Sequence, residues 1–188
     1  MNVIITDIPG RELLYCSSLL DKSNSMFIIY FTISDIDTPF FISKQFIQNA
    51  IQRNSLWLGY VYEYVLFGRQ YYNKIDLLPQ PQIKLLIKKR FNFLNPSLVF
   101  LPCFPDNNGV SKLNCAVTEL CQENKIGLIE YGQIKFPNYF RYLDMKNIDK
   151  KFKALQKYGQ LLKNKEITSI ETFRIKLFYN EIFNFRKK

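Results

Sequence analysis

Carboxylates at the ends of strand-like segments, or within them, are the side chains of this sequence best suited to chemistry. The set is Asp35, Asp37, Glu63, Asp76, Asp106 and Glu130. Because the chain contains no histidine, hydrolysis would have to use carboxylates, lysines and a bound divalent metal ion, whose water can attack at neutral pH. The sequence has no glycine-rich phosphate loop, no GxSxG or HExxH motif and no paired CxxC. Metal-assisted hydrolysis is therefore the reaction class that these residue types permit.

Basic side chains form a second set, and they gather toward the C-terminus. Residues 135–188 hold 14 Lys and Arg against 5 Asp and Glu, which is +9 of the net charge of +10. A cationic segment joined to a nearly neutral body predicts a surface for a polyanion, above all nucleic acid, with an acidic membrane surface as the lesser alternative. Lysines that only keep an aromatic-rich protein in solution are the structural alternative. The side chains expected to bind nucleic acid are Lys84, Lys88, Lys89, Arg90, Lys150, Lys151, Lys153 and Lys157.

Residues 97–135 indicate most clearly which elements position these side chains. A short apolar run over 97–103 is followed by prolines, an aspartate and a glycine, which is typical of a buried strand that ends in a loop. Apolar residues then recur at helical spacing over 110–121, and a second apolar run follows over 126–129. Two strands joined by a crossover helix normally lie parallel and buried. This segment therefore predicts an α/β fold.

The rest of the chain alternates in the same way. A helix with an apolar stripe should begin near Ile148 and reach Leu162, and the spacing of Thr168 and Glu171 is that of a capping box that opens a last, aromatic helix. We therefore expect an α/β core over residues 1–136 and a basic helical C-terminal extension over 137–188, within one compact domain. The remaining predicted elements are strands over 3–8, 26–33 and 56–67, and helices over 12–21, 43–54 and 82–93.

The order of these elements resembles the PD-(D/E)XK nuclease-like superfamily, which includes restriction enzymes, Holliday-junction resolvases and several archaeal and viral proteins. The resemblance covers residues 56–131. LWLGYVYEYVLF is similar to the central catalytic strand, QIKLLIKKRF to the following helix, SLVFLPC to the next strand and IGLIEYG to the closing strand. It implies a central mixed sheet flanked by helices, with a restriction-endonuclease-like core.

The resemblance also implies a set of catalytic residues. In this superfamily an acidic residue precedes a strand that carries Glu-x-Lys, and the carboxylates hold Mg²⁺ beside the lysine. Asp35 or Asp37 would be the first acid and Glu63 the second, with Mg²⁺ or Mn²⁺ as the cofactor. Lys84 or Lys88 would stabilise the negative charge that develops in the reaction, and Lys88 is the one taken as catalytic. Val65 stands where the lysine of the motif is expected, so the signature is degenerate.

Structural alternatives stay open for each candidate. Asp35 and Asp37 can form a turn, Glu63 can face solvent on an alternating strand, and the basic cluster at 88–90 can be a solvated helix end. A second placement of the motif uses a Pro-Asp pair followed by Gln-Ile-Lys, within residues 105–135.

Three functions follow as expectations. The first is a Mg²⁺-dependent DNA endonuclease or resolvase, the second a catalytically inactive DNA-binding or assembly module, and the third a Rossmann-like nucleotide sensor. The sequence shows no signal peptide and no apolar run long enough to span a bilayer, so we expect a soluble, cytoplasmic protein with reduced cysteines and no membrane partner. A homodimer and an origin in a virus-infected archaeal host are further expectations.

Overall fold

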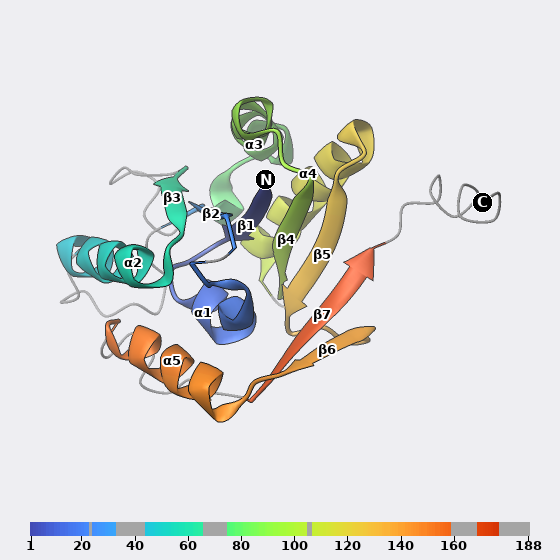
Figure 1. Ribbon diagram of the computed structural model, residues 1–188. Helices are drawn as coiled ribbons and strands as arrows, with labels where there is room; N and C mark the ends of the chain where they lie inside the picture. The colour runs from blue at the N-terminus through green and yellow to red at the C-terminus, as the bar shows by residue number, and fades with distance from the viewer. Residues whose placement is uncertain (23, 33–43, 66–74, 105–106, 159–168, 177–188) are drawn as a thin grey trace.

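One seven-stranded sheet organises the molecule (Figure 1). The computed structural model describes residues 1–22, 24–32, 44–65, 75–104, 107–158 and 169–176. The strand order is β3-β2-β1-β4-β5-β7-β6, in which the first five strands are parallel and the last two antiparallel to their neighbours. The strands are β1 (Asn2–Thr6), β2 (Met26–Tyr30), β3 (Val61–Tyr64), β4 (Leu98–Cys103), β5 (Gly127–Gly132), β6 (Tyr139–Tyr142) and β7 (Ile170–Lys176).

Helices cover both faces of this sheet. One hydrophobic core lies between the sheet and α1, α2 and α5, and the other lies between the sheet and α3 and α4 (Figure 1). Side chains of a strand alternate between the faces, so Ile4 of β1 lies in the first core and Ile5 in the second. The described helices are α1 (Arg11–Cys16), α2 (Lys44–Leu58), α3 (Gln80–Leu94), α4 (Asn108–Asn124), α5 (Met145–Gln156) and the short 3-10 helices η1 (Ser17–Leu19) and η3 (Ile75–Leu77).

The strand, helix and strand predicted over residues 97–135 are confirmed as β4, α4 and β5. The two strands are parallel, in a register that pairs Leu98 with Gly127. Asn107 caps the helix, because its side-chain oxygen accepts a hydrogen bond of 3.0 Å from the backbone N–H of Val110. Lys125 ends the helix in the left-handed conformation, at φ 56°. The α/β class and the central mixed sheet are thus confirmed.

The strand predicted over 56–67 is largely wrong. Its first residues belong to α2, since Ile51 and Leu58 continue the buried stripe of that helix. Gly59 then ends the helix at φ 76°, and its N–H donates to the carbonyl of Ser55 at 2.8 Å. Only the short edge strand β3 remains of the predicted central strand.

The last helix, predicted from the spacing of Thr168 and Glu171, is also wrong. Thr168 lies outside the described residues, and Glu171 lies in β7, which pairs with β5 and β6. Ile170, Thr172 and Phe173 are β-branched or aromatic residues, which favour strands. The chain after residue 137 therefore adds two antiparallel strands to the same sheet.

The other basic helix is confirmed in part. Helix α5 begins at Met145, and Asp144 caps it by accepting a hydrogen bond of 2.7 Å from the N–H of Asn147. It ends at Gln156, and Leu162 lies outside the described residues.

The four cysteines are free thiols: Cys16 and Cys121 are buried, Cys103 is half-buried and Cys115 is exposed. None of the helices described is long and apolar enough to cross a bilayer.

Candidate functional site

The sheet has one point at which the chain reverses the direction of strand addition, between β1 and β4. From β1 the chain adds β2 and then β3 on one side, and it returns to add β4 and β5 on the other. In parallel α/β sheets, ligands bind outside the carboxyl ends of the strands at such a point. The residues that follow β1 and β4 are therefore the first place to look for a site.

Asp7 and Arg11 meet directly after β1. The guanidinium Nη1 of Arg11 binds the carboxylate Oδ2 of Asp7, one helical turn away along the chain. Gly10 makes the tight connection between strand and helix possible, because its φ of 95° is a conformation that residues with a Cβ rarely adopt. The pair is mostly covered: 14% of the Arg11 side chain and 5% of the Asp7 side chain are exposed.

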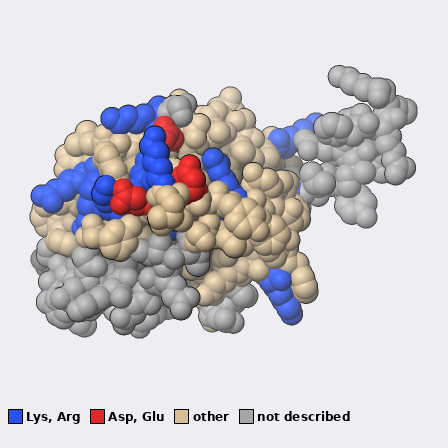
Figure 2. All heavy atoms as spheres, turned by 60° about the horizontal axis from the view of Figure 1, so that its bottom comes forward, with Lys and Arg blue, Asp and Glu red and all other residues tan. Residues whose placement is uncertain are grey.

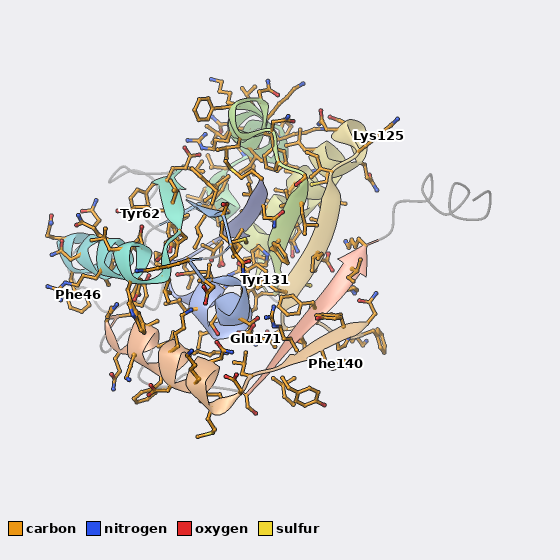
Figure 3. The ribbon with its side chains drawn as sticks, viewed as in Figure 1. Phe46, Tyr62, Lys125, Tyr131, Phe140 and Glu171 are labelled. Atoms are coloured by element: carbon orange, nitrogen blue, oxygen red, sulfur yellow. The ribbon has the colours of Figure 1, made fainter. Side chains whose placement is uncertain are left out.

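Aromatic rings line the same place. The guanidinium carbon of Arg11 lies 4.0 Å from the centre of the Phe104 ring, just after β4. Tyr15 of α1 meets Phe104 edge to face, with ring centres 5.4 Å apart. Tyr131 of β5 reaches across the sheet, and its hydroxyl donates to the carbonyl of Ile5 at 2.8 Å (Figure 3). We call Asp7, Arg11, Tyr15 and Phe104 the strand-end site.

A buried carboxylate lies next to this site, on the inner side of α1. The Oε1 atom of Glu12 accepts hydrogen bonds from the hydroxyls of Tyr30 at 2.9 Å and Tyr158 at 3.4 Å, and its Oε2 accepts from the N–H of Gly10 at 2.8 Å. Burial raises the pKa of Glu12 to about 7, against the opposing effect of these hydrogen bonds. The hydroxyl of Tyr60 lies 3.4 Å from that of Tyr30 and extends the network to α2.

The carboxylates at this edge do not fit a divalent metal ion. Asp7 is bound to a guanidinium, whose charge opposes a second cation, and Glu12 points to the tyrosines. The described part of the chain contains no group of three or more Cys, Asp or Glu side chains that could hold a metal. The residues described at this edge therefore offer no ligand set for the Mg²⁺ or Mn²⁺ expected from the sequence.

The predicted metal ligands are not brought together by what the structure describes. Asp35 and Asp37 lie outside the described residues, although the chain leaves β2 at the same edge of the sheet as β1. Glu63 lies on β3, at the far edge of the sheet. Its Oε1 is 2.6 Å from the Nε of Arg90 on α3, although the two groups are not aligned for a hydrogen bond.

The other carboxylates singled out in the sequence are similarly scattered. Glu130 on β5 is 2% exposed and forms ion pairs with Arg174 and Lys176 of β7. Asp76 belongs to η3, and Asp106 lies outside the described residues.

The basic residues of α3 differ in their partners. Lys84 binds Glu119 at 2.8 Å and Glu123 at 2.7 Å, both on α4. Lys88 lies one turn further along α3. The pKa of Glu123 is lowered mainly by the hydrogen bond from Lys84, and the charge of Lys88 adds to that shift. Lys88 therefore acts on Glu123, whereas Glu63 lies beside Arg90. Lys89 is exposed.

Most of the lysines expected to bind nucleic acid in and directly after α5 contact other elements of the molecule. Lys151 is 1% exposed, so it is not part of a surface, and its Nζ lies 3.4 Å from Glu171. Lys150 pairs with Asp21 at 2.9 Å, Lys153 pairs with Asp149 within the helix at 2.6 Å, and Lys157 lies 4.3 Å from the centre of the Trp57 ring. Figure 2 shows Lys and Arg interspersed with Asp and Glu on this face of the molecule.

Sequence reasoning missed every residue of the strand-end site. The turn at Pro9 and Gly10 was visible, yet Asp7, Arg11 and Glu12 around it were not counted among the candidates. The available signal was a charged cluster directly after the first apolar strand, at the edge where α/β sites are built.

Comparison with known proteins identifies the fold. No model of a protein family matches the sequence, and no curated protein matches it. Among solved structures, the conserved protein TT1542 of Thermus thermophilus has a TM-score of 0.69 and 18% identity over 94% of both chains. The deacetylase Dbv21, which acts on an antimicrobial pseudoaglycone, has a TM-score of 0.68 and 14% identity over 87% of this chain and 83% of its own. The 4-carboxy-2-hydroxymuconate hydratase GalB from Pseudomonas putida has a TM-score of 0.60 and 10% identity over 94% and 96%.

These likenesses correct the sequence-based interpretation. The molecule shares its fold with these solved structures, so the predicted restriction-endonuclease-like core is wrong. The predicted nuclease and the inactive DNA-binding module rested on that interpretation and on the charge pattern, and the nucleotide sensor rested on a Rossmann-like fold. These predictions are wrong, because the solved structures that share the fold include deacetylases. The expected origin in an archaeal virus rested on the same resemblance and loses its basis.

Proposed function

We propose that this chain binds an N-acylated, carbohydrate-like molecule at the strand-end site and does not hydrolyse it. The observation that carries the proposal is the guanidinium of Arg11, held between the carboxylate of Asp7 and the ring of Phe104 at the point where the strand order reverses. The likeness to Dbv21 supports an acylated ligand, because that protein is a deacetylase of the same fold.

The chemistry of the site suits such a ligand. A guanidinium presents several N–H donors in a fixed plane, which match an acyl oxygen or neighbouring hydroxyls. Tyr15 and Phe104 offer apolar surface for the carbon face of the ligand. Because Asp7 holds Arg11 in place, little side-chain freedom is lost on binding.

Binding without hydrolysis is favoured by the ionisable groups that the structure describes at this edge. Amide hydrolysis needs a group that activates water and a group that protonates the leaving nitrogen. Asp7 is ion-paired with Arg11, and burial raises the pKa of the half-buried Tyr15 further from neutrality. Glu12 has a suitable pKa but is fully buried.

The test is calorimetric titration of the full-length protein with oligomers of N-acetylglucosamine, with acetate release measured in parallel. We expect saturable binding with no acetate. Arg11→Met should weaken binding about tenfold or more, because a charge-assisted hydrogen bond contributes about 1.5–3 kcal/mol. Arg53→Met, which removes an exposed arginine of α2, is the matched control and should bind as the wild type does. Absence of binding, or equal weakening in both variants, would contradict the proposal.

A second function, amide hydrolysis at the same edge, is favoured by the pKa of Glu12. A value of about 7 is that of an effective general base. This alternative predicts acetate release that is lost in Glu12→Gln, with a pH profile that rises through neutrality. Acetate release that persists in Glu12→Gln would exclude Glu12 as the base.

A further inference from the structure

Among the residues that the structure describes, no strand lies on the outer side of the edge strand β6, so its main-chain groups on that side have no strand partner there. It is the last strand of the sheet (Figure 1), and all four of its residues are exposed. The N–H of Leu143 donates to the carbonyl of Ser169 at 2.8 Å, on the side of β7. Hydrogen-bonding direction alternates along an antiparallel strand, so the main-chain groups of Phe140 and Tyr142 point to the open edge.

Strand β6 is short and carries one charge, but neither a proline nor a lysine lies within it. Open edges are commonly protected by proline, lysine or a bulge. The sequence of β6 is Tyr-Phe-Arg-Tyr, with one charged side chain. Figure 3 shows Phe140 at the outer limit of the described sheet.

The aromatic side chains along this edge are also unusually exposed. The exposed fractions are 72% for Phe136, 49% for Tyr139, 51% for Phe140 and 77% for Tyr142. At roughly 200 Å² for a whole aromatic side chain, these four leave about 500 Å² of accessible surface on each chain. Two such surfaces together set an upper limit of about 1,000 Å² on the area that the pairing buries, which is the size at which a specific protein interface begins.

We propose that β6 pairs with β6 of a second copy of this chain, antiparallel about a two-fold axis, so that one sheet continues through both subunits. An isologous contact of this kind needs only one self-complementary patch, which the paired main-chain groups provide. The edge carries no carboxylate that would select a basic peptide, and its one charge is Arg141.

Arg141 selects the register of the pair. If the axis passed through Arg141, the two guanidiniums would lie opposite each other, and like charges in that position destabilise a sheet. If the axis passes through Phe140, the two Phe140 side chains are opposite and Arg141 faces Tyr139 of the second copy, where a cation–π contact is favourable. The charge pattern thus points to the Phe140 register.

The test is sedimentation velocity of the full-length protein over micromolar concentrations. We expect a dimer, whose affinity rises with salt because both subunits are strongly cationic. Phe140→Lys places two charges at the axis and should weaken the dimer about tenfold or more. Phe93→Lys is the matched control: it changes a phenylalanine of α3 that is 87% exposed and should leave the dimer intact.

A second variant separates the main-chain pairing from a general effect of charge. Tyr142→Pro removes an outward N–H without removing a bond to β7, and it should also give monomers. A cooperative thermal unfolding transition in each variant, similar to that of the wild type, checks that the subunit itself is folded. A monomeric wild type at 100 µM, or a dimer that persists in both β6 variants, would overturn the proposal. Ligand binding at the strand-end site is measured separately, so failure of one proposal does not imply failure of the other.

Discussion

Two carboxylates buried on the same side of the sheet have opposite kinds of partner. Glu12 lies under α1 and accepts hydrogen bonds from tyrosine hydroxyls and a backbone N–H, all neutral donors. Glu171 of β7 lies under α5, where it accepts from the side chains of Ser17 and Ser18 and forms an ion pair with Lys151. Both carboxylates are 1% exposed or less.

The difference shows how burial is compensated in each region. A carboxylate with neutral donors can escape the penalty of burial by taking up a proton, and the pKa of Glu12 rises to about 7 accordingly. At Glu171 a cation is buried as well, and burial lowers the pKa of Lys151 while the carboxylate opposes that shift. The stability contributed around Glu12 should therefore depend on pH. The stability contributed around Glu171 should instead fall when one partner of its ion pair is removed.

The largest effect should come from breaking the buried ion pair. Lys151→Met leaves Glu171 buried with serine donors alone, and removing one partner of a buried pair costs about 3–5 kcal/mol. The free energy of unfolding from urea titration measures it. Lys153→Met is the matched control on the same helix, because that lysine is 59% exposed in its pair with Asp149, and it should cost less than about 1 kcal/mol.

The double variant tests the reason for the loss. With Glu171→Gln added to Lys151→Met, no uncompensated charge remains and part of the stability should return. Equal losses in Lys151→Met and Lys153→Met would mean that the buried pair is no different from a surface one.

The next effect in size is the pH dependence of stability at Glu12. Its pKa is near 4.5 in the unfolded chain and about 7 in the folded one, so the folded state binds more protons between these values. Stability should therefore fall as pH rises from about 4.5 to 7, by about 3 kcal/mol, and should not change further through this group above pH 7.

Urea titrations from pH 5 to 8 would measure this slope. Glu12→Gln should abolish it, because the amide does not titrate. Glu119→Gln, which changes a half-exposed carboxylate of α4, should keep the slope of the wild type. A slope that survives in Glu12→Gln would assign the proton uptake to another group.

Four of the five parallel strands described were predictable because their signals are local. The apolar runs of β1, β2, β4 and β5 are bounded by turn residues, and the stripe of α4 repeats at helical spacing. Strand β7 was not predictable, since Ile170 to Lys176 suits a helix or a strand locally. Whether this segment forms a strand depends on the edge of β5, where Phe173 pairs with Tyr131, 42 positions earlier in the chain.

The strand-end site was hidden for a related reason. Asp7, Arg11 and Glu12 are ordinary polar residues around a turn, and their meaning depends on where β4 lies relative to β1. The network of Glu12 likewise needs Tyr30 and Tyr158, which come from distant segments. Strand order and the burial of single polar groups are tertiary properties, which cannot be predicted from local patterns in a single sequence.

The smallest effect should come from a third pair, which separates burial from the kind of partner. Glu63 and Arg90 join a carboxylate to a cation as Glu171 and Lys151 do, but 35% and 21% of their side chains are exposed. Water screens such a pair, so Arg90→Met should lower the free energy of unfolding by less than about 1 kcal/mol, and 1 M salt should remove most of that difference. A loss as large as that of Lys151→Met would show that the cation, and not the burial, decides the outcome.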